Sequence, residues 1–591
     1  MQLLLILSGE QTFSPGKLES TGCLSHSFFD FIGYLGRFDK IKISLPMKTL
    51  HKALALVLIS CLYLSVQAQK TGLQSISPDE LKMHLQFLSS DELEGRDTGE
   101  PGLQVAARYL AVQAQHLGLK AIDADQDYLQ PYYIREKAYD RETSHTTINV
   151  SDSVTMINRE SFYMFPAPQG DQTVIEGDVV FAGYGIKDEK NNYNDFENID
   201  IKDKVVLIMN RAPMNEEGTE AQFDNGKWMS MQNFQYKMPY IFSQEPRAVL
   251  VVMDPKSGMQ SIEDVNPAVA RYLGKSTELK PEKEESTGLA ARPGMVLIHR
   301  SVADQLLEAS GKTLKDLQLA IDQNLAPQSF LLENTRVKIE LNMATRDLEV
   351  YNVFGLIEGS DPVLKDEVVI YTAHYDHMGT DGNGGVFNGA DDNASGSVAL
   401  IEIAEAFMKE KKRPKRSIGI LWVSGEEIGL FGSQYFADHP LVQQDNIAAV
   451  INLDMLGRTK MEEDVKSKRS GLTIQGGDSV KVIGGLQSKV LMDINKSTLE
   501  DMGLVGNYIY NDPNHPDRYF YRSDHVNFAR KDIPVLSYST GTHRDYHMLT
   551  DVEERIDYDK YLKMTRFCYK VGYNVAQYSD PIEVDKPMSG W

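Results

Sequence analysis

The feature that most constrains the fold is a set of short, continuously apolar runs in the C-terminal half of the chain. They span residues 368–372, 418–423, 448–453 and 534–538. Runs without polar alternation are typical of strands that are buried on both faces. Helical patterns lie between them, as in 395–411 and 432–439. The alternation predicts an α/β fold with a mixed, largely parallel central sheet sandwiched by helices.

Two helices are predicted ahead of this region. Ser77 is a candidate N-cap, Pro78 suits the first helical position, and Glu80 completes a capping box. A second helix follows the loop 94–99 and is expected to stop near Gly118. These helices alone cannot close a core.

The residues between these two parts, 141–345, have a different pattern. Short β-type runs at 179–181, 204–209, 247–253 and 295–298 are separated by polar stretches. This pattern predicts a β-rich inserted domain with a few helices. It contains no cluster of His, Asp and Glu at ligand-like spacing, so we expect a role in packing or substrate gating.

The first residues resemble an export signal. A basic stretch after Met47, an apolar run and small residues near Ala68 predict a signal peptide at 47–68. Signals begin at the true N-terminus, so we expect 1–46 to be a spurious upstream extension; a genuine extension with an internal anchor is the alternative. Cys61 follows a lipobox-like sequence and gives a lipid anchor as a second alternative. We expect an exported, periplasmic or extracellular protein whose mature chain has no transmembrane span.

The composition excludes some classes of partner and ligand. Lys and Arg number 61 against 84 Asp and Glu, a net charge of -23, which argues against a general electrostatic surface for nucleic acid. The only cysteines are Cys23, Cys61 and Cys568. They are too few and too scattered for a thiolate site or a disulfide framework. Any metal must therefore be held by His, Asp and Glu.

Metal-competent side chains follow the apolar runs one after another, at the predicted strand ends. These candidates are His374, Asp376, Asp391, Asp392, Glu426, Glu427, Asp454, Tyr546 and His547. Each has an ordinary alternative, since Asp before a helix often caps it and paired Glu often lies at a helix N-terminus. Because the carboxyl ends of parallel strands meet at one edge of a sheet, we expect these side chains to lie together. Imidazole and carboxylate ligands without thiolate suit Zn²⁺, and also Mn²⁺ or Co²⁺.

At these residues the chain resembles the M28 family of zinc metallopeptidases. The matching stretches are 94–96, 374–376, 388–396, 424–428, 452–455, 523–525, 546–547 and 550–551. The resemblance covers roughly 75–140 and 346–580 and implies a phosphorylase/hydrolase-like fold. It also implies that residues 69–140 and 346–591 are two parts of one catalytic domain. The insert resembles a protease-associated (PA) domain through 179–186 and 193–196, the second of which leads into 204–208.

The resemblance implies a dinuclear zinc site. Asp392 matches the ligand that bridges two Zn²⁺ ions. His374 and Asp454 match the remaining ligands of one ion, and Glu427 and His547 those of the other. In this family the peptide bond after the bridging aspartate is often cis.

Three further positions match residues that act without binding metal. Glu426 matches the general base, and Asp376 matches the carboxylate that orients the His374 ring. Tyr546 matches the position whose hydroxyl stabilises the oxyanion in some members. His525 fits its motif but not as a ligand, and we interpret it as structural.

The leading functional expectation is an aminopeptidase acting on peptide or protein substrates. The alternative is a carboxypeptidase or dipeptidase, which needs a cationic pocket for the substrate carboxylate; Arg522 and Arg544 are candidate cations. A non-catalytic, receptor-like binding protein using the insert is a third possibility, which the intact ligand set disfavours. The sequence carries no signal for an oligomeric state.

Overall fold

The computed structural model describes residues 72–588, except 123–126, 141–142, 151–152, 157–161, 166–171, 230–232, 262–263, 265–274, 282–293 and 468–470. The expected extension 1–46, the signal at 47–68 and Cys61 lie outside the described residues. Among the helices within that range, none has both the length and the apolar character needed to cross a membrane.

The central sheet of the catalytic domain has the strand order β17-β16-β18-β15-β13-β14-β12. Strand β13 pairs in parallel with β14 and β15, and β15 pairs in parallel with β18; β12 and β16 run antiparallel to β14 and β18. The bounds are β12 Phe330–Ile357, β13 Val368–His374, β14 Ser417–Val423, β15 Ile447–Leu453, β16 Ser479–Gly484, β17 Val505–Asn507 and β18 Val535–Ser539. The predicted mixed, largely parallel sheet is confirmed.

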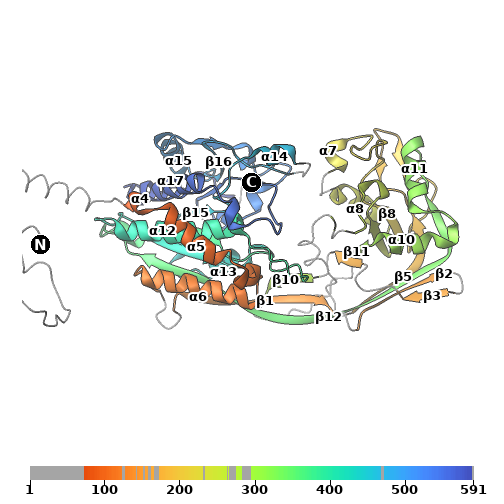
Figure 1. The fold of residues 1–591 in the computed structure, drawn as a ribbon, viewed down its shortest axis with the longest axis horizontal. Coiled ribbons are helices and arrows are strands. Elements are labelled where there is room, and N and C mark those ends of the chain that lie inside the picture. The colour runs from red at the N-terminus through yellow and green to blue at the C-terminus, as the bar shows by residue number, and fades with distance from the viewer. Residues whose placement is uncertain are drawn as a thin grey trace, which may run out of the picture. The chain divides into compact units, whose positions relative to one another are not determined.

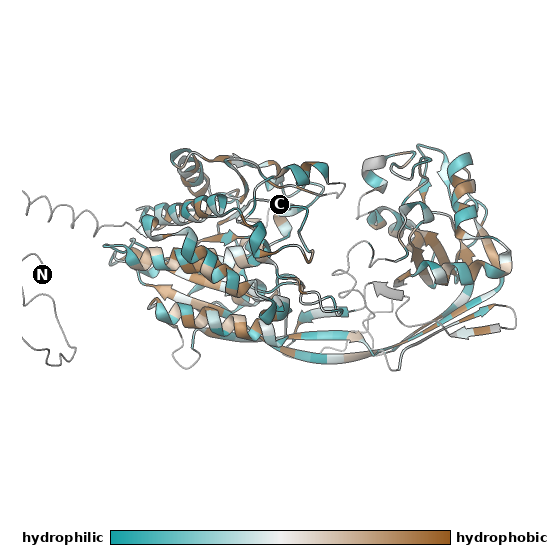
Figure 2. Ribbon diagram, in the orientation of Figure 1, coloured by the Kyte–Doolittle hydropathy of each residue, from teal (hydrophilic) through white to brown (hydrophobic). Residues whose placement is uncertain are grey.

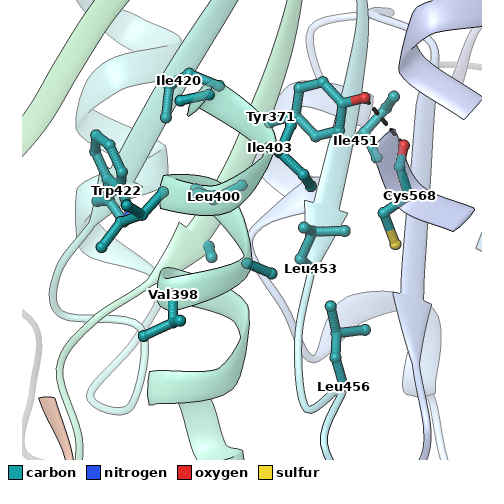
Figure 3. Packing of buried hydrophobic residues seen from close by; sticks show 14 of the residues in the cluster. Tyr371, Val398, Leu400, Ile403, Ile420, Trp422, Ile451, Leu453, Leu456 and Cys568 are labelled. Carbon is teal, nitrogen blue, oxygen red and sulfur yellow. Dashed lines mark hydrogen bonds between the residues drawn. The ribbon is translucent and has the colours of Figure 1, made fainter. Parts of the chain in front are cut away.

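Helices cover both faces of this sheet (Figure 1). Alternate residues of one strand enter different cores: Tyr371 packs in the cluster that contains α12 and α17, whereas Ile370 packs with α13 and α16. In Figure 3, the α12 side chains Leu400 and Ile403 lie over this sheet, and the Tyr371 hydroxyl donates to the Cys568 carbonyl at 3.0 Å. The helices are α12 Gly396–Lys409, α13 Phe431–Asp438, α15 Lys489–Asp501, α16 His525–Ala529 and α17 Tyr558–Gln577.

The two N-terminal helices are α5 Pro78–Leu88 and α6 Pro101–His116. Ser77 caps α5 as predicted, because its side chain accepts from the Glu80 N–H at 3.2 Å. The predicted capping box is wrong, since the Ser77 backbone N–H donates to Glu402 at 3.3 Å and the Glu80 carboxylate accepts the Ser77 hydroxyl instead. Gly118 follows the end of α6 with a φ of 76°, a left-handed conformation that ends helices. Both helices pack their apolar faces into the cluster that also contains α12.

The insert contains a second, smaller sheet with the order β12-β5-β8-β9-β11-β4. Its strands β5, β8, β9 and β11 are parallel neighbours, and their apolar residues divide into two cores, one on each face. Figure 2 shows the strands around β8 as predominantly hydrophobic. The bounds are β4 Phe162–Phe165, β5 Gln172–Phe181, β8 Val205–Met209, β9 Ala248–Val252, β11 Gly294–Ile298, α7 Asn225–Trp228, α8 Phe234–Ser243, α10 Arg300–Leu307 and α11 Leu314–Asn324.

Strand β12 belongs to both sheets (Figure 1). Its first part pairs with β5 and β2 (His145–Val150), and its second part pairs with β1 (Leu129–Tyr139). Strand β10 (Lys275–Leu279) pairs with β1 on the side away from β12. The expected boundary between insert and catalytic domain, 345/346, therefore falls inside one continuous strand, and the domain division stays a prediction.

Candidate metal centre

The strand ends bring the predicted residues together. His374 is the last residue of β13, and Asp454 directly follows β15. Glu426 and Glu427 follow β14, and His547 lies in the turn region after β18. Since β13, β14, β15 and β18 are mutually parallel, their carboxyl ends meet at one edge.

A first group of side chains surrounds His374. Its Nε2 lies 3.5 Å from Asp392 Oδ1 and 3.7 Å from Asp454 Oδ1. One ligand atom each from His374, Glu426 and Asp454 lies within 4.8 Å of the others. The Nδ1 of His374 faces the backbone oxygen of Asp376 at 3.2 Å and must donate, because a carbonyl only accepts. This tautomer leaves the Nε2 lone pair available for a metal.

A second group surrounds the other oxygen of Asp392. His547 Nε2 lies 3.1 Å from Asp392 Oδ2 and 3.1 Å from Glu427 Oε2. His377 adds a residue that the sequence analysis missed, with Nδ1 2.7 Å from Glu427 Oε1 and 3.8 Å from Asp392 Oδ2. The only sequence signal for His377 was its position one residue after Asp376. A strand-end pattern does not predict which side chains of the following loop point into the site, so His377 was missed.

Asp376 contacts the His374 ring and also binds the backbone of both glutamates. Its Oδ1 accepts the Glu426 N–H at 3.2 Å, and its Oδ2 accepts the Glu427 N–H at 3.3 Å and the Thr98 hydroxyl at 3.1 Å. Its Oδ1 also lies 3.7 Å from His374 Nδ1. Asp376 is fully buried, so these contacts are sheltered from water. One carboxylate thus fixes the backbone of both glutamates and orients an imidazole.

Asp551 fixes the loop that carries Asp392 through backbone hydrogen bonds. Asp551 Oδ2 accepts the N–H groups of Asp391 and Asp392, both at 3.1 Å. The peptide bond between Asp392 and Asn393 is cis, as the resemblance implied. Gly389 has a φ of 54°, and a Cβ there would lie 2.2 Å from the Asp392 carbonyl, so this turn requires glycine.

Arg96 ties the N-terminal part of the domain to the same loops. Its guanidinium donates to the carbonyls of Tyr375 at 2.8 Å, Asn388 at 2.7 Å and Gly389 at 3.0 Å, and also to that of Leu88. Arg96 is completely buried and lies in the 94–96 stretch that matched the family. It therefore fixes the two loops that bear His374 and Asp392 relative to α5.

Tyr546 and His525 occupy different environments beside the two groups. The Tyr546 ring stacks on the His547 ring with centroids 3.8 Å apart, and burial together with the nearby Asp392 raises the pKa of its hydroxyl well above the usual value. His525 belongs to neither group, and its ring edge packs on Phe520 at 5.5 Å. Burial lowers the pKa of His525 to about 4, so its imidazole is neutral near pH 7.

The electrostatics of the centre favour a bound cation. Burial acts to lower the pKa of both His374 and His547, but nearby carboxylates outweigh it. Glu426 is the main cause that raises the pKa of His374 well above its usual value. Glu427 is the main cause that raises the pKa of His547 to about 10. Burial raises the pKa of Asp392 and Glu426, and neighbouring Glu427 raises both further. Clustered buried carboxylates are costly unless they are paired or coordinate a metal. The donor set of imidazole nitrogen and carboxylate oxygen fits Zn²⁺.

Comparisons with known proteins agree with this chemistry. Residues 352–572 match the family model described as Peptidase family M28. A probable zinc metalloprotease of Pyrenophora tritici-repentis is 27% identical over 226 residues, which cover 34% of this chain and 44% of that protein. Leupeptin-inactivating enzyme 1 of Streptomyces exfoliatus is 32% identical over 108 residues, 18% of this chain and 23% of its own length. The chain spans about half or less of the lengths of these curated relatives.

A solved structure with a similar chain course is an aminopeptidase from Aneurinibacillus sp. strain AM-1. It is 17% identical, covers 87% of this chain and 96% of its own, and has a TM-score of 0.49.

Proposed function

Residues 352–572 match peptidase family M28, and on this premise we propose that the chain is an exported, dinuclear zinc aminopeptidase. One observation carries the proposal: the two oxygens of Asp392 face two different sets of ligands. Oδ1 lies beside His374, and Oδ2 lies beside His547. A carboxylate that presents one oxygen to each of two ligand sets suits a bridging role between two ions.

The residues divide into two sets of ligands around this bridge. His374 and Asp454 would hold one zinc ion, and Glu427 and His547 the other. His377 would donate to Glu427 and fix its orientation, as partners of metal-bound carboxylates do. When bound, the two ions would lower the pKa of a shared water molecule and polarise the substrate carbonyl.

The protein's own groups supply the remaining steps. Glu426 takes the proton of the attacking water and passes it to the leaving amine. Asp376 holds Glu426 in place through the hydrogen bond from the Glu426 backbone N–H. The Tyr546 hydroxyl stabilises the oxyanion that develops on the substrate carbonyl. A free amino terminus can approach such a centre and be held by nearby carboxylates, which favours an aminopeptidase.

The test combines metal analysis with a substrate series. We expect about two zinc ions per chain, and hydrolysis of free and C-blocked dipeptides with loss of cleavage on N-blocking alone. Loss of cleavage on C-blocking alone would instead select a carboxypeptidase, and protein without zinc or activity would favour a receptor-like role.

Glu426→Gln separates the roles of base and ligand, because Glu426 lies within the first group of possible ligands. The variant should keep the zinc content and lose most turnover. The matched control is Glu462→Gln, whose side chain is 79% exposed. Near-wild-type turnover in E426Q, or loss of one zinc ion, would show that Glu426 is not the base.

Export is tested on the native protein. We expect N-terminal sequencing to find a chain that begins near residue 69. A chain that still carries residues 1–46 would contradict the proposed signal peptide.

A further inference from the structure

A cluster of cations and aromatic rings lies beside the metal centre, on strand β16 and the segment before α16. Lys481 is only 4% exposed, and its Nζ lies 4.2 Å from the ring centroid of Tyr519 and 5.2 Å from that of Tyr510. The Arg522 guanidinium lies 4.4 Å from the same Tyr519 ring. The two tyrosine rings contact each other at 4.6 Å.

Neither cation has a counter-ion in the described part of the chain. Among the residues that the structure describes, no carboxylate lies within 4.0 Å of the Lys481 ammonium or of the Arg522 guanidinium. By contrast, Arg544, the other cation that the sequence suggested, pairs with Glu463 at 3.0 Å. A buried ammonium is costly without a partner, and aromatic faces offset only part of that cost. An unpaired buried cation therefore fits an anionic ligand.

The sheet register places this cluster next to Asp454. Lys481 pairs with Ser539 of β18, whose neighbour Tyr538 pairs with Leu453, and the Asp454 N–H donates to the Tyr538 carbonyl at 3.1 Å. Two strand spacings, about 10 Å, thus separate the backbones of Lys481 and Asp454.

Lys481 and Asp454 also lie on the same face of the sheet. The neighbours of Lys481, Val480 and Val482, enter the core with α12 and α17, so Lys481 points to the opposite face. Leu453 enters that same core, which turns Asp454 the other way, toward Lys481.

Electrostatic contact supports this placement. Burial lowers the pKa of Lys481 to about 8; Asp454 opposes this shift and Arg522 adds to it, so both charges lie within electrostatic reach. Arg522 also directly precedes Ser523, whose hydroxyl accepts from Asn452 at 2.8 Å, two residues before Asp454. The two cations therefore flank the same metal-ligand candidate.

We propose that Lys481 and Arg522, arranged around Tyr519, form a subsite for a carboxylate group of the peptide substrate. This inference rests on the proposed peptidase function and adds a substrate class to it. One residue of extended peptide spans about 3.5 Å, so a carboxylate two residues from the scissile bond lies about 7 Å from it, and the length of the Lys481 side chain covers the rest of the separation of about 10 Å between the backbones. The carboxylate can be the α-carboxylate of a short peptide or the side chain of an acidic residue.

The experiment compares four substrates that share an N-terminal leucine: Leu-Ala, Leu-Ala-amide, Leu-Glu-amide and Leu-Gln-amide. Lys481→Met removes the charge and keeps most of the volume. We expect it to raise KM about tenfold or more for a carboxylate-bearing substrate and to leave its neutral partner within about twofold. An effect on Leu-Ala against Leu-Ala-amide identifies the α-carboxylate as the ligand. An effect on Leu-Glu-amide against Leu-Gln-amide identifies the side chain.

Two further variants guard against a folding artefact. Arg522→Gln changes an exposed residue and should raise KM for the same substrate, by about threefold. Lys466→Met, whose native side chain is 72% exposed, should change nothing. Zinc content is measured for every variant. An equal loss on all four substrates, or unchanged KM in both K481M and R522Q, would overturn the subsite.

Failure of the subsite and failure of the proposed function give different results. A wild type that holds zinc and cleaves Leu-Ala-amide, without any dependence on Lys481, refutes the subsite alone. If the wild type cleaves none of the substrates, the proposed function fails. Calorimetric titration with the dipeptide Ala-Glu then decides the subsite: binding that weakens about tenfold in K481M supports it, and equal or absent binding in both proteins overturns it.

Discussion

Replacing Asp376 with asparagine tests how the centre is held in shape. The substitution keeps the size of the side chain but turns one acceptor oxygen into a donor NH₂ group. In the native protein Oδ1 accepts the Glu426 N–H and Oδ2 accepts the Glu427 N–H and the Thr98 hydroxyl. Whichever way the amide turns, one backbone N–H of the two glutamates faces a donor.

The magnitude follows from that lost acceptor. A buried N–H left without a partner costs about 1–3 kcal/mol. The cost is relieved only if the segment with Glu426 and Glu427 moves away from the position that binds metal. Because about 1.4 kcal/mol corresponds to a factor of ten, we expect the zinc affinity of D376N to fall roughly 5- to 150-fold. Effects of about 10- to 100-fold are typical of partners that orient metal ligands.

The assay is competition for zinc with a chromophoric chelator near neutral pH, together with kcat on a C-blocked dipeptide. Asp493→Asn is the control, since the Asp493 side chain is 55% exposed and pairs with Lys489 on the surface of α15. Zinc affinity in D376N within twofold of the wild type, with kcat also unchanged, would refute the argument that Asp376 positions the two glutamates.

Three other predictions follow from buried polar groups. His377→Gln should weaken the binding of one of the two proposed zinc ions about tenfold in the same competition assay, because Glu427 loses its 2.7 Å partner; unchanged zinc affinity would contradict this. Arg96→Met should lower the free energy of unfolding of the metal-free protein, measured in urea, by about 4 to 6 kcal/mol, because four carbonyls lose a charged donor. The control Arg108→Met changes an exposed residue and should have little effect. Equal losses of stability in the two variants would contradict the prediction. Glu402 is 1% exposed, and burial raises its pKa from 4.5 to about 8. Between these pH values the folded protein keeps a proton that the unfolded chain releases. The free energy of unfolding of the wild type therefore falls as the pH rises from 4.5 to about 8. Glu402→Gln stays neutral, so its free energy of unfolding relative to the wild type should rise by up to about 5 kcal/mol from pH 4.5 to 8, and a difference that stays flat would refute the assignment.

The sequence by itself determined the fold class and the main candidates of the site. Continuous apolar runs identified β13, β14, β15 and β18, and the Ser77 cap was correct to the residue. These are local signals: hydrophobic periodicity and capping act within a few residues, so they are legible without knowledge of the fold. The rule that parallel strands end at one edge predicted that the candidate segments lie together, whereas the choice of His374, Asp392, Glu427, Asp454 and His547 as ligands came from the family resemblance and stays a prediction.

Only the tertiary structure decided which side chains support that site. Asp376 reaches the N–H groups of two glutamates some fifty positions along the chain, and Arg96 reaches carbonyls almost three hundred positions away. Arg522 and Arg544 were equivalent candidates in the sequence, yet Arg544 pairs with Glu463, whereas no carboxylate of the described residues pairs with Arg522. Lys481 carried no local signal, because its place beside Asp454 arises from the register of β16 on β18. Such contacts depend on strand pairing and loop closure between distant segments, which local patterns do not encode.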